Sequence, residues 1–85
     1  MNKKATTKDE LFLVKLHELA LLRGDFEQEI DKYAIGRAIG QNDRGINAIV
    51  VLLAKANFVK KGEENAVYLT ELGRELVQTL ILERS

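Results

Sequence analysis

Hydrophobic and polar positions along the chain predict a first helix over 7–23. The segment Thr7 to Glu10 fits a capping box, and the apolar residues that follow recur at helical spacing until Gly24 supplies a stop. These apolar residues cover more of the helix circumference than one core-facing stripe requires. We therefore expect part of this helix to offer an apolar surface to another partner.

A short helix and a longer one are predicted in the middle of the chain. Asp31 is a suitable N-cap for a helix over 32–39, and a glycine directly after that segment is a suitable stop. After a tight polar turn, Asn42 can cap a second helix over 43–56, whose apolar residues keep the 3.6-residue period. Asn57 is expected to close it, since Asn tolerates the left-handed conformation found after helix ends.

The rest of the chain predicts a β-hairpin followed by a helix. Runs of strand-forming residues over 58–61 and 66–69 flank a polar tip over 62–65. Thr70 can then cap a final helix over 71–83. Its main apolar stripe is expected to be Leu72, Leu76 and Leu80, widened by Val77, Ile81 and Leu82.

Taken together, this order of elements resembles the winged helix-turn-helix superfamily, and most closely its MarR-like regulators. The segments that carry the resemblance are 35–40 (IGRAIG), 53–59 (LAKANFV) and 69–76 (LTELGREL). The resemblance implies a mainly α fold with a small β-hairpin, in which a three-helix core, a wing and a C-terminal helix form one domain over 7–85. It also allows a short strand near 25–30 that pairs with the wing. Residues 1–6 are expected to be a disordered basic tail.

Formal charge is segregated along the chain, although the total is zero at pH 7. Residues 32–61 carry a net charge of +5, whereas residues 9–31 carry −5 and residues 62–85 carry −3. The positive charge therefore lies on the segment that would approach a polyanion.

If the resemblance extends to function, the chain is a DNA-binding transcriptional regulator that reads the major groove with helix 43–56. Family geometry would place four cations near phosphates: Lys32, Arg37, Lys60 and Lys61. It would place four further residues near the groove: Gln41, Asn42, Arg44 and Asn47. Arg44 and Asn47 are the candidates for base contact, because Arg pairs with guanine and Asn with adenine.

A second hypothesis remains open, in which the same helix binds a protein. Where relatives commonly carry polar or basic residues, this helix has small or apolar ones: Gly45, Ala48, Val51 and Leu52. The wing tip also carries Glu63 and Glu64, which a phosphate would repel. A winged-helix protein-interaction module would use this small apolar face.

Catalytic and metal-binding roles have little support in the composition. The chain has no Cys and a single His, His17, and no Ser lies in a nucleophile or phosphate-loop motif. We therefore expect no enzyme, cofactor or metal site. The longest apolar run, 48–54, is too short for a membrane span, which takes about 20 residues, and a cytoplasmic location is expected.

Surplus apolar surface on helices 7–23 and 71–83 favours a homodimer. The alternative is that the apolar faces of both helices are buried within one small core.

Overall fold

The computed structural model of the 85-residue chain describes residues 7–84, so the basic tail expected over 1–6 lies outside the described residues. The described residues form four helices and three strands. In chain order these are α1 (Lys8–Leu22), β1 (Ile30–Asp31), α2 (Lys32–Ile39), α3 (Asp43–Lys55), β2 (Val59–Lys61), β3 (Ala66–Leu69) and α4 (Glu71–Arg84). The expectation of a mainly helical fold with a small antiparallel β element is confirmed.

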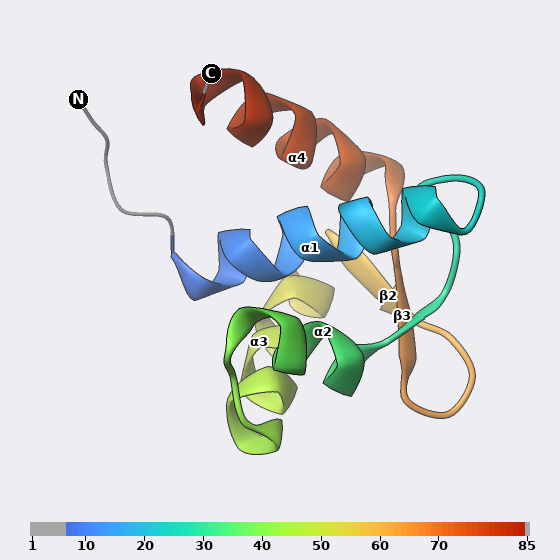
Figure 1. The fold of residues 1–85 in the computed structure, drawn as a ribbon, viewed down its shortest axis with the longest axis vertical. Coiled ribbons are helices and arrows are strands. Elements are labelled where there is room, and N and C mark those ends of the chain that lie inside the picture. Colours follow the sequence, from blue (N-terminus) through green and yellow to red (C-terminus); the bar gives the residue numbers. More distant parts are fainter. Residues whose placement is uncertain (1–6, 85) are drawn as a thin grey trace.

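Helix α1 lies at the centre of the molecule. In Figure 1, α4 lies on one side of α1, whereas α2, α3 and the loop between β2 and β3 lie on the other side. The strands form an antiparallel sheet in the order β1-β3-β2, with Ile30 opposite Val67 and Val59 opposite Leu69. The short strand before α2, which the sequence only allowed, is therefore present and pairs with β3.

The helix ends follow the capping residues that the sequence indicates. The Thr7 hydroxyl accepts from the Glu10 amide, and the Glu10 carboxylate accepts from the Thr7 amide, each at 3.2 Å. Asn57 has φ 66°, and the chain after α3 closes through Asn57 N–H to Ala54 O and Phe58 N–H to Leu53 O, both at 3.0 Å. This pair of bonds is a Schellman motif with Asn in the left-handed position. The predicted end of α3 is confirmed.

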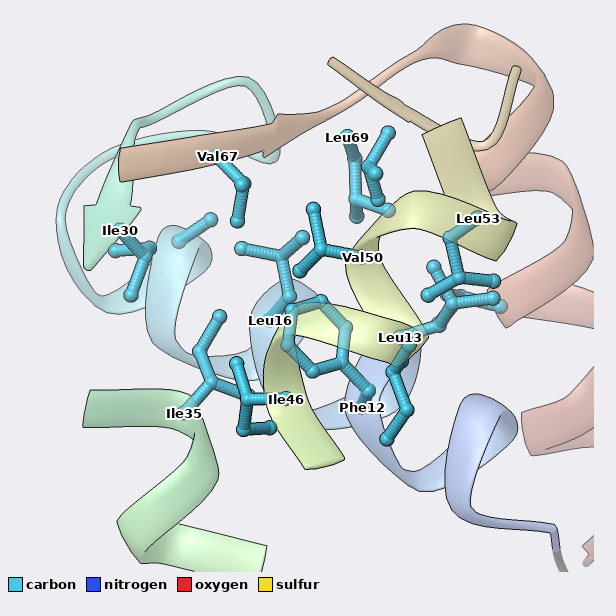
Figure 2. Packing of buried hydrophobic residues seen from close by; sticks show 14 residues of the cluster. Phe12, Leu13, Leu16, Ile30, Ile35, Ile46, Val50, Leu53, Val67 and Leu69 are labelled. Carbon is cyan, nitrogen blue, oxygen red and sulfur yellow. The ribbon is translucent and has the colours of Figure 1, made fainter. Parts of the chain in front are cut away.

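Apolar side chains from the helices and from the sheet meet in one core. Figure 2 shows side chains of α1, α2, α3 and the sheet pointing toward one another, with the ring of Phe12 between α1 and α3. The largest fully buried side chains are Phe12, Leu13, Leu16, Ile35, Ile46, Leu69, Val50, Val59, Val67 and Val77. The core therefore fixes α2, α3 and the hairpin relative to one another.

The predicted apolar stripe of α4 is wrong at one position. Leu72 is 48% exposed, whereas Gly73 and Val77 are buried and Leu76 is only half-buried. The cause is a close approach at Gly73, where an added Cβ would collide with the carbonyl oxygen of Phe58. Because Gly73 faces the chain before β2, the inward stripe of α4 runs through Gly73, Val77 and Leu80, and Leu72 is turned outward.

Candidate nucleic-acid interface

Helices α2 and α3 are joined by a turn that two glycines make possible. Gly40 has φ 77°, a left-handed conformation that costs glycine little, and the Gln41 amide donates to the Gly36 carbonyl at 2.8 Å. Gly36 is buried, and a Cβ there would collide with the side chain of Ile46. The absence of a side chain at Gly36 therefore lets α3 pack directly on α2.

Two of the predicted groove residues are engaged at the start of α3. The Asn42 side-chain oxygen accepts from the Gly45 amide at 2.8 Å, so this oxygen serves as the N-cap. The Gln41 side-chain oxygen lies where a Cβ of Gly45 would be. Gly45 is half-buried beside the Gln41 side chain, on the part of α3 that the second hypothesis assigns to a protein contact.

The cationic side chains between 32 and 61 are accessible. Five of the six are exposed and Lys32 is half-buried. Within the described residues the ion pairs are Lys15 with Glu18 and Arg74 with Glu71, so none of these six cations is neutralised by an ion pair there. The six are Lys32, Arg37, Arg44, Lys55, Lys60 and Lys61. They come from α2, α3 and β2, the elements that the core holds together.

A hydrogen bond connects α2 to the predicted reading residue of α3. The Tyr33 hydroxyl donates to the side-chain oxygen of Asn47 at 3.3 Å. Asn47 is exposed, and it lies one helical turn after Arg44 on the same face of α3. Sequence reasoning did not select Tyr33, because fourteen residues separate the two partners and only the packing of α2 on α3 brings them together.

The hairpin tip is more acidic than the sequence of the tip indicates. Besides Glu63 and Glu64, which are both exposed, Glu29 reaches the tip from the segment before β1. Its carboxylate accepts from the Glu63 amide at 3.3 Å and lies against Gly62. Three carboxylates thus gather at this end of the hairpin, whereas Lys60 and Lys61 lie at the strand that leads to it.

Three of the four residues assigned to an apolar face of α3 are on its surface. Ala48 is exposed, Val51 is 50% exposed and Leu52 is 57% exposed. They occupy the middle and C-terminal half of α3, beyond Arg44 and before Lys55. This surface also includes the polar Asn47, and a cation lies near each of its ends, Arg44 at one and Lys55 at the other.

The chain's single histidine lies beside an open hollow between two helices. His17 lines an open hollow of about 420 Å³ with Gln78, Ile81 and Leu82, between α1 and α4. Burial lowers the pKa of His17 below its usual value, and the positive charge of Arg74 lowers it further, so both effects favour the neutral ring. Among residues 7–84, no group of three or more His, Cys, Asp or Glu side chains could hold a metal ion. No helix in that range has the length and apolar content that crossing a bilayer requires.

Comparisons of the chain with protein-family models, with curated proteins and with solved structures found no match.

Proposed function

We propose that the protein is a winged helix-turn-helix DNA-binding protein, a transcriptional regulator of MarR-like type in which α3 enters the major groove. The observation that carries the proposal is the excess of positive charge on α2, α3 and β2, where six cations form no ion pair with another described residue, in a chain whose net charge is zero. Such a local excess supports contact with a polyanion better than an even distribution of charge would.

The arrangement of the elements supports the same function. A short helix, a tight turn and a longer helix are the parts of a helix-turn-helix unit, and the β2–β3 hairpin would be the wing. Arg44 and Asn47 on α3 would contact base edges. Lys32, Arg37 and Lys60 would contact phosphates, which fix the position of the protein without reading sequence.

Removing one cation from α3 and one from β2 tests the proposal. We expect Arg44→Ala combined with Lys60→Ala to weaken binding to a labelled duplex about tenfold or more, because hydrogen bonds to charged groups are among the stronger ones. Fluorescence anisotropy at low salt measures the effect. Both side chains are exposed and neither forms an ion pair with another described residue, so the fold should be retained, which circular dichroism checks.

The matched control removes the same charge from the two ends of α1, at Lys8 and at the C-cap residue Arg23. Lys8→Ala combined with Arg23→Ala also lowers the net charge by two, at exposed positions outside the proposed interface. We expect this variant to bind duplex nearly as tightly as the original chain. Equal reductions in affinity for the two variants would mean that only overall charge matters, and the assignment of the interface to α2, α3 and β2 would be rejected.

The exposed apolar face of α3 favours a second candidate function. Val51 and Leu52 are about half exposed in the middle of a helix, and the carboxylates at the hairpin tip would repel a phosphate there. In this alternative, Ala48, Val51 and Leu52 pack against a protein partner. A chain that does not bind duplex even at low salt would favour this role over DNA binding.

We also propose that the protein is a homodimer joined through α1 and α4. Large apolar side chains remain exposed on these two helices, with Leu22 at 79% and Leu82 at 75%. Further exposed apolar residues on the same helices are Leu21, Leu72 and Ile81. Because α4 lies on the side of α1 away from α2 and α3, such a dimer would leave both copies of α3 accessible (Figure 1).

The molecular mass of the protein in solution tests the dimer directly. We expect light scattering after size-exclusion chromatography to give twice the 9.6 kDa chain mass at micromolar concentration. Leu22→Glu combined with Leu82→Glu should yield the monomer, because charges would be buried without partners in the interface. Leu52→Glu, at an exposed leucine of α3, should leave the mass of the dimer unchanged. A monomer mass for the original chain would contradict the dimer.

A further inference from the structure

The hydrogen bond between Tyr33 and Asn47 gives one residue of α2 a role in how α3 presents its side chains. We infer that Tyr33 is a positioning residue, which holds the side-chain amide of Asn47 in the orientation that reads an adenine in the major groove. The inference rests on the DNA-binding function proposed above and names one base that the site would prefer.

Tyr33 is itself held from several sides. Its backbone amide donates to the Asp31 carboxylate at 2.8 Å, at the N-cap of α2. Its ring is partly buried against the hydrophobic core, and the ammonium of Lys32 lies 5.2 Å from the ring centroid. The packing of α2 therefore determines the position of the Tyr33 side chain and of its hydroxyl. A hydroxyl held in this way restricts the orientation of the Asn47 amide that it contacts.

This contact orients the side-chain amide of Asn47 and leaves the amide able to bind a base. A side-chain amide has two acceptor lone pairs on oxygen and two donor hydrogens on nitrogen. The Tyr33 hydroxyl uses one lone pair of the oxygen, which leaves the other lone pair and both N–H groups available. Adenine presents N7 as an acceptor and its N6 amino group as a donor in the major groove, and Asn can bind both together.

Holding the amide before binding should strengthen the preference for adenine. Asn47 is exposed, so without the Tyr33 hydroxyl its amide would rotate freely in water. Ordering a side chain when a complex forms costs conformational entropy, and a group that is already ordered loses less. The effect is expected at one base pair only, because the remaining contacts of α3 and β2 do not pass through Tyr33.

The variant Tyr33→Phe tests the contact in the free protein. It removes the hydroxyl and keeps the ring that packs against the core. We expect the Asn47 side-chain amide resonances in a ¹H–¹⁵N NMR spectrum to move, while those of Asn42, which caps α3, stay in place. Tyr68→Phe, which removes the hydroxyl of the other tyrosine of the chain, should leave the Asn47 resonances unchanged. Unchanged Asn47 resonances in Tyr33→Phe would overturn the inference without any use of DNA.

Selection of bound sequences from a random duplex pool tests the reading role. We expect the original chain to enrich adenine at one position. Tyr33→Phe should lower that preference by at most about fivefold, because an ordinary hydrogen bond has an effect of about that size and this one, at 3.3 Å, is long for an O–H···O bond. Asn47→Ala should abolish the preference, and the double variant should behave like Asn47→Ala alone. A purely structural role of Tyr33 would instead weaken binding to all sequences equally, and that result would overturn the inference.

The outcomes separate the two proposals. If the original chain enriches a sequence and Tyr33→Phe enriches the same sequence with equal strength, DNA binding stands and the role of Tyr33 is rejected. If the original chain binds no duplex in a salt-sensitive way, the proposed function fails, and the reading role of Tyr33 is rejected with it.

Discussion

Replacing Gly73 with alanine is expected to destabilise the fold by about 3 kcal/mol or more, toward the upper end of what overpacking a core costs. The added Cβ would collide with the Phe58 carbonyl oxygen and would lie 2.9 Å from Leu69 Cδ2 and 3.1 Å from the Phe58 carbonyl carbon. Backbone atoms cannot rotate away as a side chain can. Relief would require α4 to move off the sheet, which carries Leu69 and packs against the inward stripe of α4.

Hydrogen bonds around Gly73 increase this cost. The Phe58 carbonyl accepts from the Thr70 amide at 3.1 Å, and the Thr70 hydroxyl donates to the Asn57 carbonyl at 2.6 Å while accepting from the Gly73 amide at 3.0 Å. A shift of α4 would disturb all three bonds together. The better helix propensity of alanine, about 1 kcal/mol, offsets only part of the destabilisation.

Thermal unfolding followed by circular dichroism measures this effect. For a domain of this size, about 3 kcal/mol corresponds to a decrease in Tm of roughly 12 to 24 °C. Gly62→Ala is the matched control, because the atoms near its added Cβ belong to the flexible Glu29 side chain, which can move aside. We expect that control to lower Tm by only a few degrees. An equal decrease in both variants would contradict the close approach of α4 to Phe58.

Much of the fold could be predicted because the ends of its helices are set by local interactions. The bounds of α2 follow from Asp31 and Gly40, and the end of α3 follows from the left-handed Asn57. Each depends on residues within about one helical turn, which a sequence pattern contains. The same is true of the hairpin, whose strands and polar tip lie next to one another in the chain.

The error in α4 occurs where distant segments touch. The leucine pattern alone placed Leu72 in the main apolar stripe of α4, whereas the contact of Gly73 with Phe58 turns Leu72 outward. This outcome does not follow from periodicity, because it depends on how closely two backbone segments approach.

The candidate site shows the same division. The cations of the proposed interface could be found by counting charge along the chain, because the net charge of a segment depends only on its own residues. Tyr33 and Glu29 could not, because their partners Asn47 and Glu63 lie on other elements. Their roles depend on the packing of α2 against α3 and on the approach of the segment before β1 to the hairpin.

Binding to duplex DNA is expected to weaken about 10²- to 10³-fold when salt rises from about 50 to 200 mM, if roughly four to six phosphates are bound. Each bound phosphate releases condensed cations from the duplex, and the logarithm of the affinity falls by about 0.9 per phosphate for each tenfold rise in salt. Fluorescence anisotropy with a duplex of arbitrary sequence measures the slope, because phosphate contacts do not depend on base sequence.

A steep slope would be informative because the chain as a whole carries no net charge. Attraction between a neutral protein and a polyanion must come from cations gathered on one surface, since an even distribution would offer as much repulsion as attraction. Arg44→Ala with Lys60→Ala should therefore reduce the slope by about 1 for each phosphate that the variant no longer binds, whereas Lys8→Ala with Arg23→Ala should leave it unchanged. A slope near zero for the original chain would mean that α2, α3 and β2 form no phosphate-binding surface, and the exposed Val51 and Leu52 would then point to a protein partner.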